Sequence, residues 1–523
     1  MKLRFIFVVS CICASTVAAQ SLSDSLFLTK VQKSSFDFFW NEANPSTGLI
    51  KDRSTSGSPC SIAATGFGLT SIGIGIDNGW ITRAAGRDRV MVTLKTFWNA
   101  PQGTGSTGVI GYKGFFYHFL KMETGEREWV SELSSIDTAL LLAGILHAKQ
   151  YFSGIDSTET NIRALADSIY YRVDWDWMRN GQSSLTMGWQ PESGFLSARW
   201  IGYNEGMIAY ILAFGSPTHS IPASAWNAWT NGYNWNTYYG YSYVVFPPLF
   251  GHQYSHCWID FRNIMDYYMR NGGVTYFENS RRATLANRAY CIANPKGFTG
   301  YGENVWGLTA SDDPDGYAAH GAPPAQSDNG TISPTAAGGS IPFAPQECIG
   351  ALRYMYDTYP NVWGTYGFKD AFNLTRNWYD TDFLGIDQGP FVLMIENYRT
   401  QSVWNAFMKN KDIQNGLTKA GFLPVTSVPA SAFVPPSEFA LEQNYPNPFN
   451  PATSITFKLT ASAHTTLRIV NALGQEVALL VNETREPGVH HVTFNAKDCA
   501  SGLYFAMLHS GSQTAVRKML LLR

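Results

Sequence analysis

Four acidic side chains stand at or beside the start of strongly apolar segments in this sequence. They are Asp137, Glu205, Glu347 and Asp387, and each is followed by mostly apolar residues. A helix that is apolar on every side lies inside a large core rather than on its surface. Each carboxylate is therefore expected at the mouth of a buried helix, where it can meet a ligand. The pattern predicts a ring of carboxylates around one pocket.

Glycoside cleavage needs two carboxyls in one pocket, because one protonates the leaving oxygen and the other activates water. A helix N-terminus lowers a carboxyl pKa, which suits the base, whereas the acid needs apolar shielding or a neighbouring carboxylate to raise its pKa. Glu205, which precedes an apolar helix, is the candidate acid. Asp387 is the candidate base and Asp137 the alternative, and for both a structural helix-start role is an equally good interpretation. Glu347 is interpreted as structural.

Further polar and aromatic side chains are candidates for substrate contacts, since tryptophan faces stack on sugar rings and polar groups bind hydroxyls. They are Glu132, Trp189, His252, His256, Asp260, Trp306 and Asp312. His252, His256 and Asp260 would share one face of a helix. A zinc protease needs glutamate where Gln253 stands, so hydrogen bonding to a sugar or within the core is preferred over metal binding. No metal and no cofactor is expected.

Helical periodicity dominates the first part of the chain, where apolar and amphipathic segments alternate. The apolar segments are 62–77, 134–152, 203–214, 251–270, 343–359 and 386–398, and the amphipathic ones include 84–98, 158–172, 279–293 and 367–378. About six inner helices wrapped by outer ones describe a mainly α fold, an (α/α)6 barrel whose loops on one side form a pocket. Glycines in 62–76 would allow close helix approach, and the long irregular segment 294–342 is expected to be functional.

The two ends of the chain differ from this body. Residues 1–19 are typical of a secretory signal peptide, and 20–423 form the expected catalytic domain. A linker rich in Pro, Ser, Ala and Val spans 424–437. From about residue 454 the pattern has period two in short segments, which predicts a small C-terminal β-sandwich of the Ig-like kind within 438–523. The segments are 454–459, 466–470, 476–480, 489–494 and 503–507.

Composition and charge limit the kinds of molecule that this protein is expected to bind. A net charge of −2 over 523 residues, without a run of basic residues, argues against a nucleic-acid binder. No segment after the signal has about 18 uninterrupted apolar residues, so no membrane span is expected. The cysteines outside the signal are few, distant and odd in number, which implies no disulfide framework. We expect a monomer that binds a carbohydrate.

Two resemblances add to this interpretation. The segment 439–451, the strands after it and the basic end 517–523 resemble the C-terminal sorting domain of the type IX secretion system. This implies that the protein passes through the periplasm and reaches the cell surface or the medium, with the secretion machinery as its partner. The segments 202–205, 251–260, 302–312 and 329–336 resemble the glucoamylase-like domain family, which includes endo-β-1,2-glucanases of glycoside hydrolase family 144. That family implies an (α/α)6 barrel and hydrolysis with anomeric inversion.

The leading hypothesis is therefore a secreted β-glucanase that cleaves β-1,2-glucan internally with inversion. One alternative is a transglycosylase on the same glucans. Another is a surface glycan-binding protein that has lost the chemistry. A polysaccharide lyase would want a basic pocket with a Tyr/His pair, and the acidic helix starts argue against it. The linkage, endo or exo action and a proton relay through a substrate hydroxyl remain open at this stage.

Overall fold

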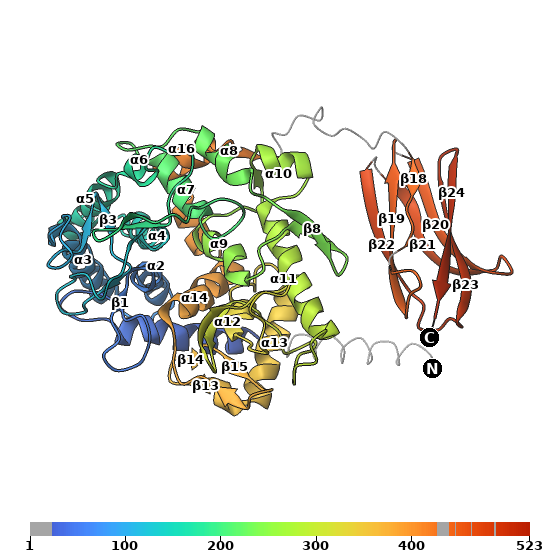
Figure 1. The fold of residues 1–523 in the computed structure, drawn as a ribbon, viewed down its shortest axis with the longest axis horizontal. Helices are drawn as coiled ribbons and strands as arrows, with labels where there is room; N and C mark the ends of the chain where they lie inside the picture. Colours follow the sequence, from blue (N-terminus) through green and yellow to red (C-terminus); the bar gives the residue numbers. More distant parts are fainter. Residues whose placement is uncertain (1–23, 426–438, 445, 462, 486–487, 523) are drawn as a thin grey trace, which may run out of the picture. The chain divides into compact units, whose positions relative to one another are not determined.

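The computed structural model describes residues 24–425 and 439–522, apart from 445, 462, 486 and 487 (Figure 1). The chain divides into two compact units, Met1–Val425 and Thr426–Arg523. The expected signal peptide 1–19 and nearly all of the expected linker 424–437 lie outside the described residues. Within the described part, every helix is too short or too polar to cross a membrane.

The first unit is mainly helical, and its most buried helices pack against one another. They are α2 (Ile62–Asp77), α4 (Ser135–Tyr151), α7 (Met207–Gly215) and α14 (Gly385–Arg399). Helix α2 packs against both α4 and α14, and α4 packs against α7. Figure 1 shows these helices near the middle of the unit. Their nearly uninterrupted burial agrees with the all-round apolar pattern of their sequences.

Other helices lie at the periphery of this unit (Figure 1). They are residues 24–41, α3 (Arg83–Asn99), α5 (Ser157–Tyr171), α11 (Tyr276–Ala293), α13 (Pro345–Thr358) and α16 (Lys411–Lys419). Helix α5 packs on α3 and α4, and α16 packs on α7. Shorter helices are α6 (Trp175–Met178), α8 (Ser224–Thr230), α12 (Pro334–Gly338) and α15 (Ser402–Phe407).

Short antiparallel strand pairs occupy the connections between the helices. They are β1 (Cys60–Ser61) with β4 (Phe119–Leu120), β2 (Gly111–Tyr112) with β3 (Phe115–Phe116), β5 (Leu133–Ser134) with β6 (Gly188–Gln190) and β7 (Gly194–Phe195), β8 (Trp235–Tyr238) with β9 (Tyr241–Val244), β11 (Ala310–Asp313) with β12 (Gly316–Ala319), and β13 (Trp363–Gly364) with β14 (Gly367–Phe368).

Three predicted helices are wrong in extent or place. Residues 251–270 contain η1 (Leu249–His252), α9 (Tyr254–Trp258), β10 (Ile264–Met265) and α10 (Tyr267–Gly272) instead of one helix. Asp260 accepts a hydrogen bond from the Arg262 N–H and Asp266 caps α10, so local side-chain bonds compete with helix continuation. Residues 367–378 hold β14, β15 (Phe372–Asn373) and the start of β16 (Trp378–Tyr379).

The predicted inner helix 343–359 is a partly exposed helix, α13, in the structure. Helix α13 buries only one face there, whereas every residue of α12 is buried. The five-residue α12 packs against both α13 and α14, so it takes the inner place. Pattern analysis missed α12 because five residues show too little periodicity.

The second unit consists of two antiparallel sheets around one apolar core. The three-stranded sheet contains β18 (Ala440–Leu441), β19 (Ala452–Leu459) and β22 (Gly488–Asn495). The four-stranded sheet contains β21 (Glu476–Arg485), β20 (Ala463–Asn471), β23 (Gly502–Ser510) and β24 (Gln513–Leu521). Ile455 and Phe457 of one sheet and Leu467 and Met519 of the other belong to this core. The expected β-rich C-terminal unit is confirmed, and β24 was not foreseen.

Glycine permits the close approach of α2 and α4. A Cβ atom added to Gly144 would lie 2.0 Å from the carbonyl oxygen of Gly66, and one added to Gly66 would lie 2.3 Å from that of Leu140. Backbone atoms cannot yield as a side chain can, so a larger residue would force the helices apart. The expectation that glycines in this segment allow close packing is confirmed at Gly66.

We expect Gly144→Ala to lower the free energy of unfolding by about 1–3 kcal/mol, because the new methyl group overlaps the Gly66 backbone. Urea unfolding of the full chain, followed by far-UV circular dichroism, measures the change. The matched control is Gly350→Ala within α13, where the nearest atom to an added Cβ is 3.9 Å away. This control should be neutral or stabilising by about 0.4–1 kcal/mol. Equal losses in both variants would contradict the close-packing argument.

Candidate active site

A pocket of about 320 Å³ collects side chains from widely separated parts of the first unit. Its polar lining consists of Asp52, Arg53, Ser61, His118, Asp137, Glu205, Tyr254 and Tyr317. Apolar side chains from β4, α4, α14 and β11 complete the wall. We call this site the carboxylate pocket. It brings together two of the three predicted catalytic carboxylates, Asp137 and Glu205.

Asp137 is held at the first turn of α4. The Ser134 hydroxyl caps the helix by accepting the Asp137 N–H at 3.1 Å, and it also contacts the Asp137 carboxylate. His118 Nε2 lies 3.6 Å from the other carboxylate oxygen, Oδ1. Asp137 is buried and faces the pocket from a rigid, capped helix end.

His118 links Asp137 to Glu132. Its Nδ1 lies 3.1 Å from Glu132 Oε1. Burial opposes protonation of His118, but the charge of Asp137 and the hydrogen bond and charge of Glu132 outweigh it and raise the pKa to about 9. Burial tends to raise the Glu132 pKa, and the contact with His118 lowers it overall. His118 is therefore an imidazolium at neutral pH and Glu132 is its counter-ion.

Glu205 lies in a turn that directly precedes α7, so it stands before the apolar helix as the sequence predicted. The Asn204 side chain accepts the Gly206 N–H at 2.9 Å, and Ser255 Oγ donates to the Glu205 carbonyl oxygen at 3.2 Å. Among the described residues, the buried Oε2 of Glu205 has no hydrogen-bond partner. Burial, aided by the charge of Asp137, raises the pKa of Glu205 to about 7. Both conditions expected for a general acid are present at this carboxyl.

Asp387 lies in the first turn of α14 and is buried, and its neighbours Leu384 and Ile386 line the pocket whereas Asp387 itself does not. Its Oδ2 is a second buried carboxylate oxygen without a hydrogen-bond partner in the described part of the chain. Burial raises the Asp387 pKa to about 7, against the hydrogen bond with Asp370 that lowers it. The lower pKa expected for a helix start is therefore wrong here, because removal from water outweighs the helix dipole.

Several carboxylates surround Arg53, which also lines the carboxylate pocket. Its guanidinium lies 2.7 Å from Asp312 Oδ2 and 3.3 Å from Asp52 Oδ2. The Asp312 N–H donates to Asp370 Oδ2 at 2.7 Å. Burial and the charges of Asp387 and Asp312 hold the pKa of Asp370 well above its usual range. This raised pKa favours the protonated form of Asp370 beside Asp387.

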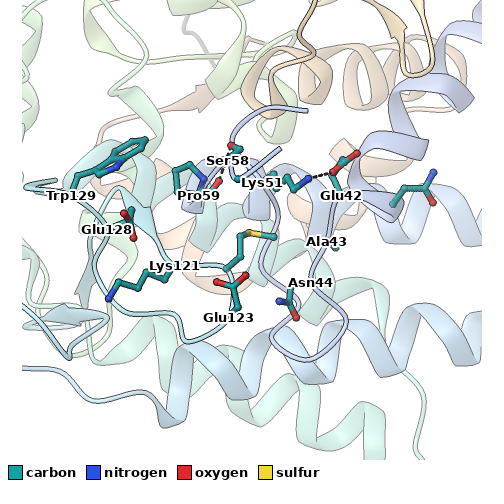
Figure 2. Close-up of a pocket in the computed structure, with 13 residues that line it drawn as sticks. Glu42, Ala43, Asn44, Lys51, Ser58, Pro59, Lys121, Glu123, Glu128 and Trp129 are labelled. Atoms are coloured by element: carbon teal, nitrogen blue, oxygen red, sulfur yellow. Dashed lines mark hydrogen bonds and ion pairs between the residues drawn. The ribbon is translucent and has the colours of Figure 1, made fainter. Parts of the chain in front are cut away.

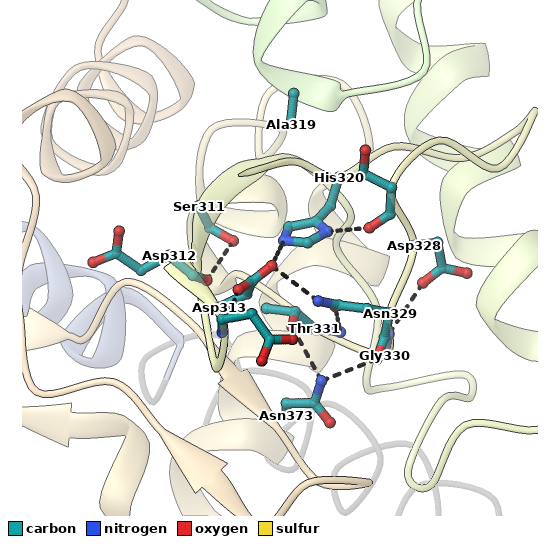
Figure 3. Close-up of polar contacts among 12 residues, drawn as sticks. Ser311, Asp312, Asp313, Ala319, His320, Asp328, Asn329, Gly330, Thr331 and Asn373 are labelled. Atoms are coloured by element: carbon teal, nitrogen blue, oxygen red, sulfur yellow. Dashed lines mark hydrogen bonds and ion pairs between the residues drawn. The ribbon is translucent and has the colours of Figure 1, made fainter. Parts of the chain in front are cut away.

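The β11–β12 hairpin of the long segment 294–342 delivers Tyr317 to the pocket. Figure 3 shows Asp312 and Asp313 pointing to opposite sides of β11, as alternation along a strand requires. Asp313 Oδ2 accepts from Asn329 at 2.9 Å and lies 3.2 Å from His320 Nε2. These bonds fix the hairpin base, while Asp312 turns toward Arg53. The expected functional role of this segment thus has a structural basis.

Five predicted substrate contacts do not line the carboxylate pocket. They are Trp189, His252, His256, Asp260 and Trp306. His252 and His256 are buried, and burial lowers the pKa of each to about 3, so both are neutral core groups. Asp260 pairs with Arg262 at 2.7 Å. Because 251–270 is not one helix, these three residues share no helix face.

Of the two predicted tryptophans, Trp306 belongs to the core and Trp189 packs against other aromatic rings. Trp306 is fully buried. Trp189 packs on Tyr112 and Trp177, with ring centroids 5.5 and 5.7 Å apart.

The other two predicted substrate contacts, Glu132 and Asp312, lie next to the pocket, because each contacts a residue that lines it. His118, Asp52, Arg53 and Asp370 were missed, because single polar residues in strands and turns carry no periodic signal.

Among the residues that the structure describes, two groups of side chains have ligand atoms close enough to hold a cation. They are His118, Glu132 and Asp137, and Asp312, Asp370 and Asp380, each with atoms within 4.8 Å of one another. In the first group the imidazolium of His118 occupies the place of a cation. In the second, Arg53 neutralises Asp312, and burial holds the pKa of Asp370 high. Protons and Arg53 thus balance much of this charge.

Comparisons with known proteins agree with this architecture. A family model described as "Putative glucoamylase" matches residues 197–411. The endo-β-1,2-glucanase from Chitinophaga pinensis, solved with sophorotriose and glucose, is 33% identical, with a TM-score of 0.70 over 76% of this chain and 98% of that chain. The chain belongs to the glucoamylase-like family of glycoside hydrolases.

Other members of this family are similar over comparable lengths. A putative glucoamylase from Bacteroides uniformis is 38% identical, with a TM-score of 0.71 over 77% of this chain and 98% of that chain. An exo-β-1,2-glucooligosaccharide sophorohydrolase from Parabacteroides distasonis is 34% identical over 448 residues, which are 78% of this chain and 59% of that protein. Residues 443–522 match the secretion system C-terminal sorting domain, so the second unit is a sorting domain.

The raised Glu205 pKa predicts a pH-dependent stability. Its ordinary value is 4.5 and its folded value about 7, so the stability provided by the protonated form is complete below pH 4.5 and is lost as the pH rises through 7. Glu205→Gln removes this loss. We expect the variant to exceed the unsubstituted protein in unfolding free energy by roughly 3 kcal/mol at pH 8, and by little at pH 4.

Chemical denaturation of both proteins at the two pH values tests this expectation. Glu303→Gln is the control, because the Glu303 side chain is 72% exposed and should give no such difference. A Glu205→Gln effect of the same size at pH 4 and pH 8 would show that Glu205 is not a buried acid.

Proposed function

We propose that this protein is a secreted glycoside hydrolase that cleaves β-1,2-glucan internally with inversion of the anomeric centre. The observation that carries the proposal is the Glu205 carboxyl, which lines a pocket, has an unpartnered oxygen and a raised pKa, and stands beside Asp137. Such a group is still partly protonated near neutral pH and can donate its proton to a leaving oxygen.

The relatives support the substrate class. The Chitinophaga pinensis relative is named an endo-β-1,2-glucanase, and the chain covers nearly all of it. The sophorohydrolase acts on β-1,2-glucooligosaccharides from the non-reducing end, and the match spans 59% of its length. We therefore propose β-1,2-glucan as the substrate and endo-cleavage as the mode.

In the proposed mechanism, Glu205 donates its proton to the glycosidic oxygen as the bond to the anomeric carbon breaks. Water attacks that carbon from the opposite face and loses a proton to Asp387. Because Asp387 does not itself line the pocket, we propose that a substrate hydroxyl relays this proton. Asp137 keeps Glu205 protonated by its charge and is the alternative base.

The architecture that we propose for the first unit is the (α/α)6 barrel. The helices α7, α4, α2, α14 and α9 contact one another in this order, and α9 contacts α7 again. This closed set of contacts, with α12 packed against α14, supports an inner ring of helices. The proposed catalytic domain is 20–423 and the proposed sorting domain 438–523, an Ig-like sandwich joined by the linker 424–437. The sorting domain supports export by type IX secretion, for which we propose passage through the periplasm.

Removing the acid or the base should abolish most turnover. We expect Glu205→Gln and Asp387→Asn each to lower kcat on linear β-1,2-glucan by roughly 10²- to 10⁴-fold, because proton transfer to the leaving group or from water is lost. Reducing-end assays measure the rate. The matched control is Glu347→Gln, since Glu347 also begins a helix but does not line the pocket.

The same assays separate the competing functions. Products longer than the substrate would favour a transglycosylase, and binding without new reducing ends would favour a glycan-binding protein. Near-normal turnover in both variants would overturn the assignments of Glu205 and Asp387.

The stereochemistry of the product tests the second carboxylate. An inverting enzyme releases the α-anomer first from a β-linked glucan, because water attacks the face opposite the leaving group. Proton NMR during the first minutes of hydrolysis distinguishes the two anomers. Initial release of the β-anomer would contradict the role of Asp387 as a base that activates water.

A further inference from the structure

A second cavity, of about 500 Å³, lies next to the carboxylate pocket and is lined by a different set of side chains. Figure 2 shows Trp129 at one end and the Lys51–Glu42 ion pair at the other. Its volume falls within the roughly 300–1,000 Å³ typical of small-molecule sites. We call it the Trp129 cavity.

A short strand ladder connects the two cavities. In the β1–β4 pair, Ser61 stands opposite Phe119, and both line the carboxylate pocket. Pro59 precedes Ser61 by two residues, Lys121 follows Phe119 by two residues, and both line the Trp129 cavity. Two residues of chain span at most about 7 Å. The two cavities therefore adjoin one another at this ladder.

Aromatic contacts make the same connection. The Phe119 ring stacks on His118 at a centroid distance of 4.0 Å, and Trp129 packs edge-on against Phe119 at 5.1 Å. His118 in turn lies beside Asp137. A continuous aromatic surface thus runs from the carboxylates to Trp129.

Trp129 is presented to solvent by a well-braced loop. Its side chain is 63% exposed, and its φ of 54° is unfavourable for a bulky residue. Arg127 Nε donates to the Ser131 carbonyl oxygen at 2.7 Å, and the Glu128 N–H donates to the Phe119 carbonyl oxygen at 2.9 Å. A strained, exposed tryptophan that the surrounding bonds hold in place is typical of a binding role.

The charges that line the cavity select a neutral ligand. Lys51 and Lys121 face Glu42, Glu123 and Glu128, so neither a strong anion nor a strong cation is favoured. Lys51 lies 2.6 Å from Glu42, which fixes both groups as donors and acceptors for hydroxyls. An aromatic face with polar groups around it suits a sugar ring.

We propose that the Trp129 cavity binds glucosyl residues of the glucan beyond those held in the carboxylate pocket, with Trp129 as the stacking surface. This inference rests on the proposed function. It adds a remote binding site that makes cleavage depend on chain length. Short oligosaccharides fill only the carboxylate pocket, whereas long chains occupy both cavities.

The test compares long linear β-1,2-glucan with the shortest oligosaccharide that the protein cleaves. We expect Trp129→Ala to lower kcat/KM roughly three- to tenfold on the long glucan and to leave the short substrate unchanged, since only the long chain loses the stacking contact. Trp129→Phe keeps an aromatic ring and should restore most of the long-chain activity. Trp98→Ala is the matched control, because Trp98 is also exposed (40%) but does not line either cavity.

The outcomes separate this inference from the proposed function. An active unsubstituted protein whose chain-length preference survives Trp129→Ala would overturn the remote site alone. An equal loss on long and short substrates would also overturn it, because that result indicates a structural effect on the carboxylate pocket. An unsubstituted protein that is inactive on every chain length would overturn both proposals.

Discussion

Removal of carboxylates from water is the constraint on which the carboxylate pocket depends. Glu205 is partly buried and Asp387 is buried at helix entrances, where the dipole favours ionisation, yet removal from water raises the pKa of each to about 7. The surrounding side chains share the remaining charge. His118 carries a proton beside Asp137, and Arg53 pairs with Asp312. Proton sharing and these two cations allow so many acids to face one cavity.

Close packing of helices gives this electrostatic arrangement its rigidity. Gly66 and Gly144 bring the backbones of α2 and α4 together, and Ser134 caps α4 so that Asp137 stays at the pocket. Glu205 depends instead on a turn held by Ser255, because α7 begins two residues later. Glu205 is therefore held by a hydrogen-bonded turn, whereas the neighbouring Asp137 is held by a capped helix.

The pocket also draws on segments that are not helical. The β1–β4 ladder carries Phe119, and the β11–β12 hairpin carries Tyr317. The same ladder leads to the cavity lined by Trp129. Short strand pairs between the helices thus shape the two cavities, while the buried helices α4 and α14 carry Asp137 and Asp387.

Periodicity and composition act over short stretches of chain, so they predict most of the buried helices, their acidic starts and the β-rich C-terminal unit. They do not predict the elements of 251–270 or the five-residue α12, where local side-chain bonds and shortness hide the pattern. Which polar groups meet depends on the packing of distant segments. This packing brings His118 to Asp137, buries His252 and His256, and raises the Asp387 pKa, since burial and long-range contacts depend on residues distant in the chain.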